Sequence, residues 1–110
     1  MSRGILACVY ATPTDRARPA AAYHDALTAA YASEPFVSVL PLGQSPDTAH
    51  VRGSNRVHVS VFVDARANRV IAVGAIDNLV KGAAGQAVQC LNVIHGWPET
   101  DALDTVAVFP

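Results

Sequence analysis

Two runs of strand-forming residues on either side of a short polar turn constrain the fold of this chain most strongly. Residues 51–64 give the clearest strand signal, with a valine at every second position from Val57 to Val63, and side chains of a strand point to opposite faces in turn. Residues 65–68 are a polar turn, and residues 69–76 form a nearly all-apolar return strand. The pattern predicts an antiparallel hairpin. One face would carry Val57, Val59, Val61 and Val63, and the other His58, Ser60, Phe62 and Asp64.

Three shorter elements are predicted before the hairpin. Residues 4–10 form a continuous apolar run of strand length, which is typical of a strand buried on both faces. Residues 19–32 show helical spacing of their larger side chains, and the Glu34-Pro35 pair ends that helix because the residue before a proline disfavours the helical region. Residues 36–40 then predict a short strand.

A second helix is predicted after the hairpin, over residues 81–95, and Gly96 and Pro98 stop it. The tail includes a candidate final strand at residues 106–108. This order of elements predicts one α+β domain over residues 1–110, with a largely antiparallel sheet and helices on one face.

Composition narrows the range of partners. Only 15% of the 110 residues are charged, against about 25% in soluble domains, so we expect apolar surface that another subunit or the rest of a larger domain covers. A net charge of -1 with scattered Lys and Arg argues against nucleic acid as a partner. The chain has no apolar run of the ~20 residues that a membrane helix needs and no signal-peptide pattern.

The residues that most often carry chemistry form no catalytic set in the sequence. No Gly-rich phosphate loop follows a strand, and the four histidines do not stand at metal-ligand spacing, so we expect no metal site. Cys8 and Cys90 are interpreted as buried, reduced thiols of a cytoplasmic protein. His58 is more typical of a surface histidine than of a general base.

The junction between the last strand and the second helix, residues 76–89, is the most informative segment for function. Asn78 stands where a carboxamide either caps the helix with Asp77 or bonds a ligand amide. Gly82 and Gly85 each cost ~1 kcal/mol in a helix relative to alanine. We therefore expect a flat ligand or another backbone to lie close to this helix start.

This segment resembles the C-terminal helix motif of the N-acetyl-gamma-glutamyl-phosphate reductase family, and the resemblance extends over essentially the whole chain. Single motifs are weak, but their order and spacing are specific. The matching segments are Arg3-Gly4-Ile5-Leu6, Glu34-Pro35-Phe36-Val37, Val39-Leu40-Pro41, Val51-Arg52-Gly53-Ser54-Asn55, Asn78 to Gln89, and Gly96-Trp97-Pro98-Glu99-Thr100 with Leu103.

The resemblance implies an incomplete C-terminal substrate domain of the glyceraldehyde-3-phosphate-dehydrogenase-like type, with a C-terminal helix beside the cofactor. The implied cofactor of the complete enzyme is NADP, and the implied reaction reduces an acyl phosphate to a semialdehyde in arginine biosynthesis. By the same resemblance, Asn78 would hold the cofactor carboxamide, and Gly82 and Ala83 would line its approach.

The chain departs from the family in what it lacks. The family's dinucleotide-binding domain, catalytic cysteine and catalytic histidine have no counterpart here, and neither Cys8 nor Cys90 matches the catalytic position. We therefore expect a fragment that is inactive alone, associates with itself, and needs the N-terminal nucleotide-binding portion as a partner.

Two alternatives stay open. The chain is either a non-enzymatic oligomerisation or complementation module, or a fragment of an aspartate-semialdehyde-dehydrogenase-type enzyme. The sequence does not decide whether Arg3, Arg52 or His58 approaches a substrate.

Overall fold

A computed structural model describes residues 3–107 and contains a four-stranded sheet and two α-helices. The helices are α1 (Ala20–Ala30) and α2 (Gly85–His95), and two short helical segments, η1 and η2, precede β3 and α2. In chain order the remaining bounds are β1 (Ile5–Ala11), β2 (Val37–Val39), η1 (Thr48–Val51), β3 (Val57–Asp64), β4 (Arg69–Ile76) and η2 (Val80–Ala84).

The predicted hairpin forms the centre of the sheet. The strand order is β1-β4-β3-β2, and the β1–β4 and β3–β4 pairs are antiparallel while β2 runs parallel to β3. The register pairs Asp64 with Arg69, and the Asp64 carboxylate accepts the backbone N–H groups of Arg66 and Ala67 across the turn. The predicted α+β class with a largely antiparallel sheet is therefore confirmed.

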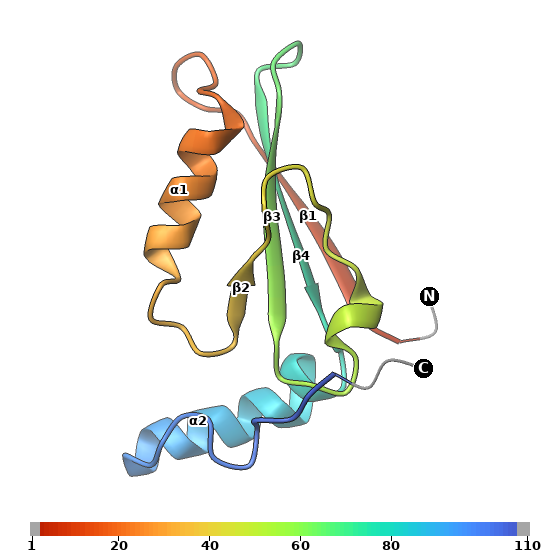
Figure 1. Ribbon diagram of the computed structural model, residues 1–110, viewed down its shortest axis with the longest axis vertical. Coiled ribbons are helices and arrows are strands. Elements are labelled where there is room, and N and C mark those ends of the chain that lie inside the picture. Colours follow the sequence, from red (N-terminus) through yellow and green to blue (C-terminus); the bar gives the residue numbers. More distant parts are fainter. Residues whose placement is uncertain (1–2, 108–110) are drawn as a thin grey trace.

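The elements around the sheet form a small core. Helix α1 lies along β2 and β3, whereas α2 crosses the end of the sheet at which β3 begins and β4 ends (Figure 1). The loop after β2 crosses one face of β3, where the Ser60 hydroxyl donates to the Gln44 carbonyl over 2.7 Å. The buried apolar side chains are Phe36, Val51, Val61, Val73, Ala75 and Leu103.

Helix α2 ends where the sequence predicts. Gly96 adopts a left-handed conformation with φ of 68°, which a side chain rarely tolerates. The Trp97 N–H donates to the Asn92 carbonyl and the Gly96 N–H to the Val93 carbonyl. This pair of hydrogen bonds is the Schellman arrangement that satisfies the last carbonyls of a helix.

The prediction that residues 4–10 are buried on both faces is wrong. Strand β1 is the edge of the sheet, and every residue in it is exposed, with Val9 at 62% and Tyr10 at 60%. Among the described residues, β1 pairs with β4 alone, and all seven of its residues remain exposed. The buried positions expected for Cys8 and Cys90 are also wrong, because Cys8 lies on this edge strand and Cys90 on the outer side of α2.

Two expected strand boundaries also differ from the structure. Residues 51–56 are not strand, because the Asp47 carboxylate caps η1 by accepting the Ala49 N–H, and Gly53 then turns the chain with φ of 74°. Strand β3 therefore begins at Val57. In the tail, residues 106–107 form no strand, and Val108 lies outside the described residues.

Candidate functional site

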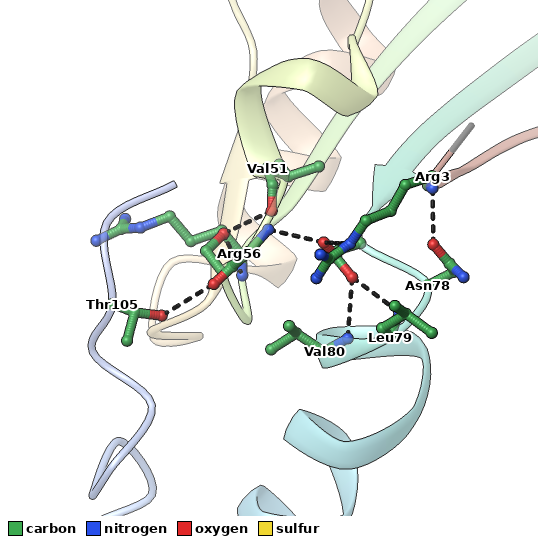
Figure 2. A network of polar contacts seen from close by, with 11 residues as sticks. Arg3, Val51, Arg56, Asn78, Leu79, Val80 and Thr105 are labelled. Carbon is green, nitrogen blue, oxygen red and sulfur yellow. Dashed lines mark hydrogen bonds and ion pairs between the residues drawn. The ribbon is translucent and has the colours of Figure 1, made fainter. Parts of the chain in front are cut away.

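The junction between β4 and η2 is organised around the carboxylate of Asp77. This side chain is fully buried, at 0% exposure, immediately after the last residue of β4. Its Oδ1 atom accepts the N–H groups of Leu79 over 2.8 Å and Val80 over 3.0 Å (Figure 2). Asp77 thus caps the start of the helical segment, as one of the two sequence interpretations of this position expected.

The second carboxylate oxygen of Asp77 connects two other parts of the chain. Oδ2 accepts the N–H of Gly53 over 2.7 Å and forms an ion pair with Nε of Arg3 at 2.8 Å. Burial alone would raise the pKa of Asp77, but hydrogen bonds from Gly53 and Val80, the Arg3 guanidinium and the Leu79 N–H lower it to about 2. The carboxylate is therefore ionised at neutral pH and joins β1, the turn at Gly53 and the helix start.

Asn78 follows this anchor and is half-buried. Its Oδ1 atom accepts the N–H of Gly4 over 2.7 Å, which fixes the orientation of the side-chain amide. Within the part of the chain that the structure describes, the Nδ2 group of Asn78 has no hydrogen-bond partner and is not buried. Asn78 therefore presents an oriented, unused pair of N–H donors beside the helix start.

The helix begins with one π-turn. Segment η2 has hydrogen bonds from the Gly82 N–H to the Asp77 carbonyl and from the Ala84 N–H to the Leu79 carbonyl, at 2.9 and 3.1 Å. Such wide turns are rare and frequent at functional sites. Gly82 and Ala83 lie exposed on this turn, four and five residues after Asn78, and the Gly82 N–H bonds to the carbonyl of the residue before Asn78.

The space around the two glycines of the junction, Gly82 and Gly85, differs. A Cβ at Gly82 would make only ordinary contacts, at 3.4 Å from the Asp77 carbonyl and 3.5 Å from Ile76 Cδ1, so this chain does not itself require glycine there. A Cβ at Gly85 would clash with Asn55 Oδ1 and lie 2.8 Å from the Val80 carbonyl. The expectation that a ligand or another backbone requires glycine at this helix start is thus wrong for Gly85, because Asn55 and Val80 of the same chain leave no room for a side chain there.

The residues that the sequence left open lie at separate places. Arg3 belongs to the Asp77 anchor. Arg52 lines a hollow of about 460 Å³ together with Leu6 and residues 46–49 of the loop before η1 and of η1 itself, and its buried Nε has no hydrogen-bond partner among the described residues. His58 lies on β3, where burial and then the positive charges of His50 and Arg56 lower its pKa. The structure does not bring these three residues together at Asn78.

Neither thiol belongs to a nucleophile and base pair in residues 3–107. The Cys8 thiol makes no hydrogen bond there, and the Cys90 sulfur accepts only from the Gln86 amide, over 3.4 Å. In that same range no group of three or more His, Cys, Asp or Glu residues is placed to hold a metal ion. No helix in the described range is long and apolar enough to span a bilayer.

Sequence reasoning missed two partners of this junction. The sequence places Gly53 in the expected strand over residues 51–64 and leaves the role of Arg3 open, yet the Gly53 N–H donates to Asp77 and the Arg3 guanidinium forms an ion pair with it. Asn55 and Gln89 form a hydrogen bond over 2.9 Å between segments 34 residues apart. A buried carboxylate needs several donors, so the Asp77 position was the signal that could have pointed to Arg3.

Comparison with known proteins assigns the family. The family profile described as semialdehyde dehydrogenase, dimerisation domain, matches residues 1–78, which include all four strands. The chain is 54% identical over 113 residues to the N-acetyl-gamma-glutamyl-phosphate reductase of Citrifermentans bemidjiense and 52% identical over 112 residues to that of Geobacter metallireducens. The reductase of Magnetococcus marinus is 50% identical over 109 residues.

These alignments cover 99–100% of this chain but only 31–32% of each relative, in its C-terminal part. The chain thus spans about a third of the length of the relatives that it matches. It belongs to the semialdehyde dehydrogenase family, whose dimerisation domain it contains, and it is similar to the C-terminal part of N-acetyl-gamma-glutamyl-phosphate reductases.

Proposed function

We propose that this chain is the C-terminal part of an NADP-dependent reductase that converts N-acetyl-gamma-glutamyl phosphate to its semialdehyde in arginine biosynthesis. Its similarity to relatives of that name along its whole length supports the proposal. The single structural observation that carries it is the junction of Asn78 with the exposed turn at Gly82 and Ala83. Two free thiols fit a reducing compartment, and we propose a cytoplasmic location.

The residues of the junction fit a nicotinamide. Because the Gly4 N–H occupies Oδ1 of Asn78, the Nδ2 group is left to donate to a carboxamide oxygen. Gly82 has no Cβ, so a flat ring could approach the backbone of the π-turn closely. When bound, the cofactor would supply the hydride, and the residues of this chain would bind and orient it.

Asn78, Gly82 and Ala83 would form one wall of the cofactor site, and the Asp77 anchor would hold the backbone of this wall in place. Its carboxylate holds the N–H groups of Leu79 and Val80 and the start of the turn at Gly53, and so fixes the backbone from which Asn78 projects. Asp77 is buried and would not contact the cofactor. Its role would be to fix the positions of Asn78 and Gly82 relative to each other.

We propose that the 110-residue chain does not catalyse the reaction alone. Acyl transfer to an enzyme thiol needs an activated cysteine and a base, and within the described residues neither Cys8 nor Cys90 is paired with a base. Turnover would require a nucleotide-binding portion corresponding to the part of the relatives that this chain does not span. The aspartate-semialdehyde-dehydrogenase alternative has less support, since the compared relatives carry the reductase name.

A second role, self-association, has its own observation. Strand β1 exposes Ile5, Leu6, Val9 and Tyr10, and a long apolar edge strand is a template for pairing with another chain. The matched family profile is that of a dimerisation domain. We propose that the sheet takes part in a homo-oligomer, either within the complete enzyme or as a non-enzymatic module.

A chimera tests the proposed function. The matched C-terminal third of the Citrifermentans bemidjiense reductase is replaced by this chain, and NADPH oxidation with the acyl phosphate is measured. We expect turnover by the chimera, and an Asn78→Asp variant should raise the KM for NADPH about tenfold because a donor to the carboxamide is lost. An unchanged KM in that variant would reject the assignment of Asn78.

A further inference from the structure

Polar contacts rather than apolar burial hold helix α2 against the rest of the chain. Its only buried residues are Gly85 and Asn92, and Leu91, Val93 and Ile94 are exposed at 46%, 59% and 78%. A helix whose apolar side chains face outwards gains little from the hydrophobic effect within this chain. The position of α2 must therefore depend on the few hydrogen bonds that it makes.

Two side chains of α2 make these hydrogen bonds. Asn92 donates to the Glu99 and Asp101 carbonyls in the turn after α2, whereas Gln89 also reaches the segment before β3. The Oε1 atom of Gln89 accepts from Asn55 Nδ2 over 2.9 Å and from Lys81 Nζ over 2.5 Å. Its Nε2 group donates to Glu99 Oε1. One amide thus connects the turn before β3, the π-turn η2 and the turn after α2.

The chemistry of the neighbours permits only one orientation of the Gln89 amide. The Lys81 ammonium can only donate, and the Glu99 carboxylate can only accept, so Oε1 must face the lysine and Nε2 the glutamate. Asn55 must then offer its Nδ2 group to Oε1, which turns its Oδ1 towards Gly85. The bridge therefore fixes several side chains at once.

The fixed orientation has a cost inside the chain. Asn55 is fully buried, and its Oδ1 atom has no hydrogen-bond partner. Burial also lowers the pKa of Lys81, while the charge of Glu99 opposes that shift, and the ammonium lies 5.4 Å from the centre of the Phe36 ring. A buried amide with an unpaired acceptor is unfavourable for stability. The hydrogen bonds of the bridge must therefore offset the cost of the unpaired Asn55 oxygen.

We propose that Gln89 is a positioning residue that holds η2 and α2 in place through its bridge to Asn55, Lys81 and Glu99. The bridge fixes the π-turn that carries Gly82 and Ala83 relative to the body of the sheet. The link to cofactor binding rests on the proposed function, whereas the positioning of the helix does not. No catalytic contact is assigned to Gln89.

Hydrogen exchange on the 110-residue chain, followed by mass spectrometry, tests the positioning. Gln89→Met keeps the length of the side chain and removes its hydrogen bonds. In the wild-type chain, local opening of residues 80–92 must break the bridge, and in the variant it does not. We therefore expect amides of this segment to exchange at least about tenfold faster, with those of β3 and β4 unchanged. The matched control is Gln86→Met at an exposed position of the same helix. Its amide hydrogen-bonds only to Cys90 among the described residues, so this variant should leave exchange within about twofold.

If Gln89→Met unfolds the whole chain, a second pair of variants that exchanges the amide of Gln89 and the carboxylate of Glu99 still tests the proposal. Gln89→Glu places two carboxylates together at Glu99 and should speed exchange in residues 80–92. Adding Glu99→Gln restores a donor between them, so the double variant should return to the wild-type rate. The proposal is overturned if the double variant exchanges as fast as the single one, or if the two methionine variants behave alike.

The functional link has a separate readout. In the chimera, Gln89→Met should weaken NADPH binding about tenfold, measured by fluorescence titration, with Gln86→Met unchanged. Loss of local exchange protection without any change in NADPH affinity would reject the link and leave the positioning intact. If the wild-type chimera binds no NADPH, the proposed function fails and the exchange result still decides the role of Gln89.

Discussion

Alanine substitutions at the two glycines of the junction should change stability in opposite directions. Alanine in a helix is favoured over glycine by about 1 kcal/mol, so propensity alone predicts the same gain at both positions. At Gly85 the added Cβ would meet Asn55 Oδ1, Val80 Cγ1 at 2.7 Å and the Val80 carbonyl at 2.8 Å. Overpacking against backbone costs about 1–3 kcal/mol, so we expect Gly85→Ala to lose about 2 kcal/mol net.

Gly82→Ala provides the matched comparison. Its Cβ would make ordinary van der Waals contacts with the Asp77 carbonyl, Ile76 Cδ1 and Ile5 Cδ1, at 3.4, 3.5 and 3.7 Å. Because nothing must move, we expect the chain to be stabilised by about 0.4–1 kcal/mol through the lower entropy of its unfolded state. In the chimera the same methyl group should weaken NADPH binding, since it would stand on the proposed cofactor side.

Urea unfolding of both variants measures these changes. The chain has one tryptophan, Trp97, which follows α2 and stacks on His95 with ring centroids 4.7 Å apart, so its fluorescence reports on this end of the molecule. Far-ultraviolet circular dichroism reports on the whole chain, and each kcal/mol should shift the melting temperature by roughly 4 °C. A Gly85→Ala variant as stable as Gly82→Ala would refute the reasoning, because the clash at Asn55 would then be absent.

Three further predictions concern the anchor, the amide and the edge strand. The folded-state pKa of Asp77 is about 2, below its ordinary 3.8, so ionised Asp77 should stabilise the chain above about pH 4. A contribution of about 1–2 kcal/mol should disappear as the pH falls from 4 to 2, and it is reduced from the full linkage value because the Arg3 partner is 35% exposed. Urea titrations at pH 7 and 2.5 check this, and Asp77→Asn should lose about 3 kcal/mol at pH 7 and remove most of the pH dependence. Asn78→Ala should cost the isolated chain about 1 kcal/mol of stability because it leaves the Gly4 N–H without its acceptor, and Asn78→Asp, which keeps an acceptor, should cost less. Thermal melts would contradict this if Asn78→Asp melted at a lower temperature than Asn78→Ala. Val9→Lys, on the exposed face of β1, should reduce concentration-dependent self-association in sedimentation velocity, and equal association of the variant would exclude β1 from the contact.

The fold class was predictable because its signals are local. Alternating valines in residues 57–63 and the polar turn at residues 65–68 specify the hairpin without knowledge of any distant contact. Gly96 marks the end of α2 for the same reason, since a left-handed residue at a helix end is a property of the glycine itself. The helix over Ala20–Ala30 lies within the predicted range.

Burial was less predictable because it depends on partners. An apolar run such as residues 4–10 predicts burial on both faces, yet β1 is an edge strand with exposed side chains in the chain as it stands. The sequence does indicate surface left uncovered, through its low charge of 15%, but not where that surface lies. Placing it on β1 and on the outer side of α2 required the strand order and the helix position.

The candidate site was predictable in part. Asn78, Gly82 and Ala83 were chosen by resemblance, and the structure adds that Asn78 is half-buried with its Oδ1 atom bonded to the Gly4 N–H, while Gly82 and Ala83 are exposed on the π-turn. Leu79 and Val80 donate to Asp77 from the next turn of the chain, but its other two partners, Gly53 and Arg3, are 24 and 74 positions away in the sequence and no local pattern specifies them. Sequence spacing also gives no hint that Gly85 makes room for Asn55.

NADPH oxidation with the acyl phosphate, measured for the isolated chain and for the chimera side by side, tests the central claim most directly. The account predicts turnover by the chimera, a raised KM for NADPH in its Asn78→Asp variant, and a signal from the isolated chain equal to that of buffer. Turnover by the isolated chain would contradict the claim that it supplies one wall of the cofactor site and not the catalytic groups. An Asn78→Asp chimera with the wild-type KM would contradict the position of that wall.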